Sequence, residues 1–183
     1  TVKQGSVFGF LGPNGAGKTT AMKMIVQLAY PDEGTISFAG ISPDDVAIRA
    51  RMGFMPENPY FYDHLTVIEF LEFCNELSGG KAVSMRKDYE AVLMKVGIGD
   101  AADRKIRTYS KGMRQRLGFA QAIIHDPDFI FLDEPLDGLD PLGRKEMKRM
   151  ILELKSRGKT IFFNSHILAD VEEICDDIGI IHR

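Results

Sequence analysis

Short apolar runs alternate with amphipathic stretches along the chain, a pattern typical of an α/β fold. Four runs lack polar alternation and predict strands buried on both faces, as in a parallel sheet: Val7 to Leu11, Phe129 to Leu132, Thr160 to Phe163 and Ile178 to Ile181. A further strand is predicted at Thr35 to Phe38, between turn signals at residues 31–34 and 40–43. The sequence therefore predicts a mainly parallel sheet that helices must cover.

Helices are predicted where apolar residues recur at i, i+3, i+4 and i+7. Three stripes have this spacing: Met22, Ile25, Val26 and Ala29; Val67, Phe70, Leu71 and Cys74; and Met147, Met150, Ile151 and Leu154. Thr66 and Glu69 have the spacing of a capping box, which predicts a helix that starts at Val67. We interpret each stripe as the core-facing side of a helix.

The domain organisation follows from where the strand signal is lost. Between about Thr66 and Arg107 only helical stretches remain, broken at residues 78–80 and 97–100. We interpret residues 63–114 as a helical subdomain inserted into a core of residues 1–62 and 115–183, so that 1–183 form one domain. The chain begins at Thr1 without a Met and ends on an apolar segment, so we expect a piece truncated at both ends.

Composition excludes several classes of protein. The formal net charge is only -3, which disfavours a nucleic-acid partner. Cys74 and Cys175 lack C-x-x-C spacing, so we expect buried, inert thiols rather than a disulfide framework or a thiolate metal site. No apolar run approaches the roughly 20 residues that cross a bilayer.

The strongest chemical signal lies between the first predicted strand and helix. It fits G-x-x-x-x-G-K-[ST]: Gly12, Pro13, Asn14, Gly15, Ala16, Gly17, Lys18 and Thr19. Glycines let consecutive amides surround phosphate oxygens, and the helix N-terminus favours anions. Lys18 is expected to reach the β- and γ-phosphates, Thr19 to bind Mg²⁺, and Thr20 to belong to the same nucleotide site. The flanking strand and helix favour this interpretation over a structural Gly-rich turn.

Two carboxylates follow the second buried strand. Asp133 is placed to reach the rim of the sheet near the phosphate loop, where it would hold Mg²⁺ through water. Glu134 points elsewhere and is placed to polarise the attacking water. Paired acids at a strand end are often only solvated, so this assignment depends on the phosphate loop upstream. Together the two motifs predict a P-loop NTPase core that uses ATP and Mg²⁺.

With these motifs in order, the sequence resembles the ATP-binding cassette (ABC) ATPases over essentially its whole length. Residues 109–116, YSKGMRQR, resemble the family's signature, usually LSGGQ followed by x-x-R. Residues 136–140 resemble the D-loop, which ends at Asp140, and His166 resembles the switch histidine. The more obvious match at residues 77–81, LSGGK, is interpreted as a helix C-cap and loop, because it lies within the helical subdomain and lacks the following Q-R.

The chain also departs from the family's pattern. Glu57 stands where the Q-loop usually has Gln; it can still ligate Mg²⁺ or water, although it adds negative charge. Lys111 and Met113 replace Gly and Gln in the signature, whereas Ser110 and Gly112 remain. The family's adenine-stacking aromatic would precede Thr1. These forms are similar to cassettes of multidrug, sodium or antibiotic export systems.

The resemblance implies a mechanism. Two cassettes pair head to tail around two ATP molecules, with Ser110 and Gly112 of one facing the γ-phosphate held by Lys18 of the other. Glu134 would activate water, His166 would contact the γ-phosphate, and Asp140 would couple the two sites. The implied function is an ATPase subunit of an exporter. A membrane-spanning permease, either a linked domain or a separate subunit, would dock on the helical subdomain and hold it on the cytoplasmic face of the membrane.

Alternatives from other classes remain. A soluble ABC protein of translation or cluster assembly would share these motifs; membrane co-fractionation with a permease, or a ribosome-bound pool, would discriminate the two. A repair-type ABC protein is disfavoured, because the residues between Gly17 and Thr108 are too few for a long coiled coil. A GTPase or small-molecule kinase is disfavoured because the sequence has no N-K-x-D element and no evident acceptor site.

Overall fold

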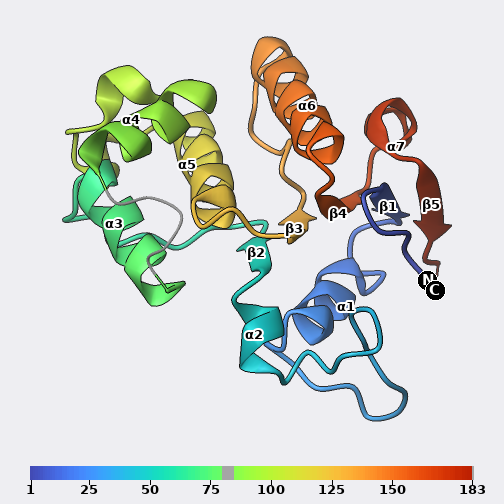
Figure 1. The fold of residues 1–183 in the computed structure, drawn as a ribbon. Helices are drawn as coiled ribbons and strands as arrows, with labels where there is room; N and C mark the ends of the chain where they lie inside the picture. The colour runs from blue at the N-terminus through green and yellow to red at the C-terminus, as the bar shows by residue number, and fades with distance from the viewer. Residues whose placement is uncertain (80–84, 183) are drawn as a thin grey trace.

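A computed structural model describes residues 1–79 and 85–182 (Figure 1). Its described residues form a parallel five-stranded sheet in the order β2-β3-β4-β1-β5. The strands are β1 (Val7–Leu11), β2 (Met52–Met55), β3 (Phe129–Asp133), β4 (Thr160–Ser165) and β5 (Asp177–Ile180). All strands run in one direction, so their carboxyl ends meet along one edge, where open α/β sheets bind ligands.

Helices cover both faces of the sheet (Figure 1). Helices α1 (Lys18–Ile25) and α2 (Val46–Arg49) lie on one face. The opposite face carries α5 (Lys111–Ile123), α6 (Pro141–Ser156) and α7 (Leu168–Ile174). Beyond α5 lie α3 (Val67–Leu77), α4 (Arg86–Lys95) and the 3₁₀ turns η1 (Gly99–Ala101) and η2 (Ile106–Thr108). Helix α5, most of which belongs to the predicted core, therefore stands between the sheet and the helices of the predicted subdomain.

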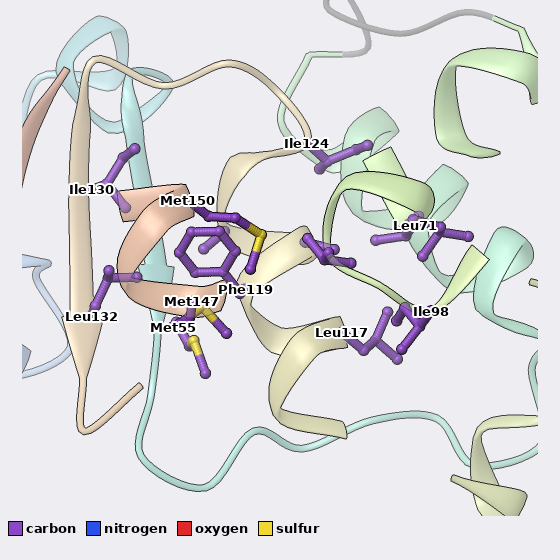
Figure 2. Close-up of a cluster of buried hydrophobic side chains, with 14 of the residues drawn as sticks. Met55, Leu71, Ile98, Leu117, Phe119, Ile124, Ile130, Leu132, Met147 and Met150 are labelled. Atoms are coloured by element: carbon purple, nitrogen blue, oxygen red, sulfur yellow. The ribbon is translucent and has the colours of Figure 1, made fainter. Parts of the chain in front are cut away.

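The main hydrophobic core is continuous across α5 (Figure 2). Phe119 packs beside Met147 and Met150 of α6, on the side of the helix that faces the sheet. Leu117 points the other way, toward Ile98 and the α3 residue Leu71. Phe119 and Leu117 are both fully buried, so α5 is fixed on two sides. The boundaries of the helical subdomain at 63 and 114 stay a prediction.

Several predicted elements are confirmed. Strand β1 has the predicted bounds, and β3 and β4 contain the predicted runs with one and two further residues. Helix α3 begins at Val67, and both hydrogen bonds of the capping box form between Thr66 and Glu69. The α3 helix ends with Ser78 as its C-cap, as predicted for the LSGGK segment, whose Gly80 and Lys81 lie outside the described residues.

The predicted strand at Thr35 to Phe38 is wrong. Phe38 forms only an isolated antiparallel bridge with Ile41, across a tight turn in which Ala39 and Gly40 have positive φ. Phe38 is buried beside Met22, Ile48 and Phe131. Its apolar character therefore serves packing on one face of the sheet rather than strand pairing.

The prediction that the last strand is buried on both faces is also wrong. Strand β5 pairs only with β1 within the described sheet, so it is an edge strand. Ile178 is 41% exposed and Ile180 is 75% exposed. The first helical stripe is shorter than predicted, because α1 ends at Ile25 and Gln27 adopts a positive φ of 63°. Ala29 therefore lies beyond the helix.

Strand β2 has no counterpart in the sequence-based prediction. It pairs with β3, with Met55 opposite Leu132. Its sequence, Met-Gly-Phe-Met, lacks the β-branched residues that mark strands. At position 53 a side chain is excluded, because a Cβ there would lie 1.9 Å from the Ala122 carbonyl oxygen. The close approach of α5 therefore requires glycine at this position.

Candidate functional site

The carboxyl edge of the sheet brings the predicted motifs together. Asp133 at the end of β3 pairs in register with Asn164 of β4, and Asn164 is opposite Phe10 of β1. The phosphate loop leaves β1 one residue later, and its Gly12 amide donates to the Ser165 carbonyl over 3.4 Å. Three segments far apart in sequence thus meet at one site.

Two glycines have conformations that the phosphate loop requires. Gly15 has a φ of 79° and Gly17 a φ of 104°, in the region that side chains disfavour. Gly17 is the N-cap of α1, and in the described structure this helix has no side-chain cap. The loop therefore offers backbone N–H groups at a helix N-terminus, which suits an anion.

Lys18 is the first residue of α1 and is only 5% exposed. Its Nζ donates to the carbonyl oxygens of Gly12 at 2.8 Å and Pro13 at 3.3 Å. It also lies 3.4 Å from Glu134 Oε1, close enough for an ion pair, although that oxygen has no hydrogen-bond partner in the described part of the chain. The structure thus places a buried cation at the mouth of the loop and beside the predicted catalytic carboxylate.

Asp133 is fully buried and only half satisfied. Its Oδ1 accepts a hydrogen bond from Asn164 Nδ2 at 3.0 Å, whereas its Oδ2 has no partner among the described residues. Leaving a buried carboxylate oxygen unpaired is costly, so such an atom indicates an absent ligand, water or ion. This unpaired oxygen fits the predicted water-mediated hold on Mg²⁺.

Glu134 links the lysine to the histidine. Its Oε2 lies 3.0 Å from His166 Nδ1, while its other oxygen faces Lys18. The Glu134 side chain is about 10% exposed, whereas the His166 side chain is 41% exposed. The carboxylate is therefore shielded, and the imidazole reaches toward solvent from the same sheet edge.

The donor set fits magnesium bound together with phosphate. Within the described residues, no group of three or more His, Cys, Asp or Glu side chains could hold a metal alone. Mg²⁺ is commonly held by one or two carboxylates together with substrate phosphates and water. Asp133 supplies such a carboxylate, and half-buried Thr19 on α1 is the predicted hydroxyl ligand.

Other predicted site residues are not part of this cluster in the single chain. Glu57 follows β2 at the same sheet edge, but its side chain is exposed. Ser110 is the N-cap of α5, and its hydroxyl accepts from the Met113 amide. Asp140 caps α6 by accepting from the Gly143 amide at 3.0 Å. The two caps have local structural roles here, and their roles toward ATP stay predictions.

The signature and the D-loop touch each other within the chain. Lys111 Nζ donates to Asp137 Oδ2 at 2.7 Å, and this hydrogen bond holds the pKa of Asp137 below its ordinary 3.8. The Lys111 stem packs against Gly138, where an added Cβ would lie 2.6 Å from Lys111 Cε. Lys111 stands where the family's signature usually has glycine, and the absence of a side chain at Gly138 of the D-loop leaves room for its stem.

Sequence reasoning assigned no role to two residues that contact the site. Asn164 lies two residues before His166, and its Nδ2 donates to Asp133 Oδ1. Gln115 was quoted within the signature, yet its Nε2 donates to the Glu134 carbonyl at 3.1 Å.

Comparison with protein families agrees with this geometry. The model of the family described as ABC transporter matches residues 1–137. The chain belongs to this family. Three of its curated relatives are described as ATP-binding proteins of ABC transporters or of bacitracin transport, and each matches 100% of the chain.

Two relatives illustrate the similarity. The cassette is 51% identical over 185 residues to an uncharacterized ABC transporter ATP-binding protein of Nostoc sp., covering 100% of the chain and 55% of the relative. It is 42% identical over 185 residues to the bacitracin transport ATP-binding protein BcrA of Enterococcus faecalis, covering 100% and 59%. The chain thus spans little more than half the length of the curated relatives it matches.

A solved structure confirms the fold. The cassette superposes on a protein described as the ATP binding subunit of an ABC transporter with a TM-score of 0.87 and 31% identity. The match covers 100% of the chain and 77% of that protein. The α/β fold with a parallel sheet flanked by helices is therefore the ABC ATPase fold. No helix among the described residues has the length and apolar character of a membrane span.

Proposed function

We propose that the cassette binds ATP with Mg²⁺ and hydrolyses it to power a membrane transporter. The observation that carries the proposal is the cluster of Lys18, Glu134 and His166 beside the unpaired oxygen of Asp133. It combines a cation for phosphate, a metal-binding carboxylate and a shielded base at one sheet edge. The names of the relatives, including the bacitracin transport protein BcrA, favour transport over the soluble alternative, and the direction we propose is export.

Binding would begin at the phosphate loop. The Lys18 ammonium now donates to two carbonyls of its own loop, and phosphate oxygens are stronger, charged acceptors. A triphosphate would therefore draw Nζ away from Gly12 and Pro13, while the amides of the loop and of α1 surround the phosphate. Asp133, Thr19 and Glu57 would hold Mg²⁺, which neutralises the charge that develops on the phosphates.

Glu134 would then act on water. Within residues 1–79 and 85–182 its Oε1 has no hydrogen-bond partner, so this oxygen is available to accept a proton from the attacking water. His166 binds the other oxygen, which fixes the direction of the carboxylate. To donate to Glu134 and to a γ-phosphate at once, the imidazole must carry protons on both nitrogens. If it carries one, it must leave Glu134 to reach the phosphate.

The remaining part of the proposal concerns assembly. A second cassette would pair head to tail so that Ser110 and Gly112 face the phosphate held by Lys18 of the other copy, with Asp140 at the junction. A membrane-spanning permease would hold the pair at the cytoplasmic face of the membrane. Helices α3 and α4 stand away from the sheet and leave their outer surface for this contact (Figure 1).

The decisive experiment is Glu134→Gln in the purified chain. The amide keeps the shape but cannot accept the proton, so we expect ATP hydrolysis to fall about 100-fold or more while Mg-ATP binding persists. Glu172→Gln, which changes an exposed carboxylate on α7, is the matched control and should hydrolyse ATP normally. Phosphate release and calorimetric titration with Mg-ATP would measure both properties. Normal hydrolysis by Glu134→Gln would reject the assigned base.

A further inference from the structure

The backbone of Glu134 is strained. Its φ is 50°, in the left-handed region that residues with a side chain seldom adopt. Such a conformation costs free energy, and it persists only where surrounding contacts determine it. The strain occurs at the residue that carries the proposed base, so the contacts that impose it also set the direction of the carboxylate.

Three hydrogen bonds hold the backbone groups of Glu134. Its N–H donates to the Asn164 carbonyl at 3.2 Å. Its carbonyl accepts from the Asp137 amide at 3.0 Å and from Gln115 Nε2 at 3.1 Å. The first two bonds join backbone to backbone. The third comes from a side chain, so it is the contact that a substitution can remove without changing the turn itself.

Gln115 is well suited to hold this carbonyl. It is 3% exposed, and a buried amide without a partner would be destabilising. It stands on α5 four residues before Phe119, which is fixed in the core between the sheet and α6 (Figure 2). The donor is therefore mounted on a rigid element, which is the arrangement that keeps an active-site group in one position.

We propose that Gln115 is a positioning residue for ATP hydrolysis: its amide holds the Glu134 peptide in the left-handed turn and so directs the carboxylate between Lys18 and His166. This inference rests on the proposed function of Glu134. Without the bond, the peptide relaxes toward the ordinary backbone region. The carboxylate then leaves its place beside Lys18 Nζ, while the phosphate loop is unchanged.

The test is Gln115→Met, which keeps a long unbranched side chain and removes the donor. The loss of one buried hydrogen bond should lower kcat about tenfold per folded molecule, with the KM for ATP changed less than about twofold. Gln121→Met makes the same change at a half-buried glutamine further along α5 and should leave both constants unaltered. A kcat equal to the parent's would overturn the proposal.

A second measurement separates positioning from general loosening of the fold. In the Glu134→Gln background there is no base to position, so Gln115→Met should leave the residual single-turnover rate unchanged. A further tenfold fall in that background would overturn the proposal. If Gln115→Met is unfolded at the assay temperature, Gln115→Asn replaces it, because its shorter side chain cannot reach the carbonyl.

The two proposals fail in different ways. If the parent chain with Mg-ATP releases no phosphate, the function proposed for the cassette is rejected and the role of Gln115 with it. If the parent hydrolyses ATP, Glu134→Gln does not, and Gln115→Met matches the parent, only the role of Gln115 is rejected.

Discussion

The ammonium group of Lys18 is buried, and its donors are directed to carbonyl oxygens of the loop that carries it. A buried ammonium without such partners would be strongly destabilising, so the loop stabilises its own cation. Glu134 Oε1 supplies a countercharge 3.4 Å away without taking a hydrogen bond. The site thus stays folded without nucleotide and keeps its strongest donor ready for phosphate.

The two cysteines give a test at the residue scale. Burial raises the pKa of Cys74 from 9.0 to about 11, and burial with the nearby Asp176 raises that of Cys175 from 9.0 to about 12. The thiolate is the reactive form, so at pH 8 we expect alkylation of the folded chain to be at least about tenfold slower than in urea. The rate should keep rising between pH 9 and 11.

The raised pKa values of the two thiols also determine how the stability of the fold changes with pH. A folded-state pKa above the unfolded value means that the folded chain retains the thiol proton longer. The contribution to stability is complete below pH 9 and is lost as the pH rises through 11 to 12. If both thiols of the folded chain were alkylated at pH 8 as fast as in urea, the raised pKa values, and with them this stability effect, would be contradicted.

At the scale of elements, α3 depends on its capping box. The Thr66 hydroxyl accepts from the Glu69 amide, and the Glu69 carboxylate accepts from the Thr66 amide at 2.6 Å. Thr66→Ala removes the first of these bonds, so we expect the free energy of unfolding to fall by about 1 kcal/mol. Urea denaturation would measure it. Thr35→Ala, at an exposed loop position, is the control and should stay within about 0.5 kcal/mol of the parent.

The elements that the sequence predicts well are those with local causes. The start of α3 follows from Thr66 and Glu69 alone, and β1 follows from an uninterrupted apolar run. Strand β2 was missed because its glycine is required by the Ala122 carbonyl, a tertiary contact that no local pattern shows. The strand predicted at Thr35 to Phe38 was wrong for a different reason: its polar and apolar residues alternate as in a strand, but within the described residues its pairing is limited to the isolated bridge between Phe38 and Ile41.

The site residues also fall into two groups, those that local sequence predicts and those that depend on tertiary contacts. The phosphate loop is a continuous motif, so spacing alone located Gly12 to Thr19. Asp133 was predicted at the rim of the sheet because it follows a buried strand, and His166 was identified by its motif. The structure brings both to the edge where the parallel strands end. The amides of Asn164 and Gln115 reach the site from other elements. Such contacts depend on register and helix packing, which sequence spacing does not determine.

At the scale of the whole molecule, one helix joins the two halves of the proposed mechanism. Helix α5 begins at the signature, where Ser110 is its N-cap, and its next turn carries Gln115 to the Glu134 peptide. Further along, Phe119 fixes the helix in the core beside α6. Helix α5 therefore connects two places rigidly. One is the Ser110 end, which is predicted to face the phosphate bound by a second copy, and the other is the Glu134 peptide of the same chain.

Gly112 allows the head-to-tail pairing to be tested without weakening the chain. An added Cβ there would lie 3.7 Å from the Gly138 carbonyl oxygen and from Leu139 Cδ2, which is ordinary van der Waals contact. Alanine also favours a helix over glycine by about 0.5–1 kcal/mol. Gly112→Ala should therefore leave the thermal midpoint of the single chain unchanged or higher.

Between two chains the same methyl group should have the opposite effect. If the Gly112 backbone closes on the phosphate held by a second copy, a side chain at that position separates the two. In the Glu134→Gln background with Mg-ATP, we expect Gly112→Ala to weaken dimerisation at least about tenfold while each chain still binds ATP, because phosphate and backbone must approach closely. Sedimentation velocity would measure the dimer, with Gln121→Ala on the same helix as control. Because the substitution leaves the single chain intact, a dimer as strong as that of Glu134→Gln alone would place the signature away from the interface.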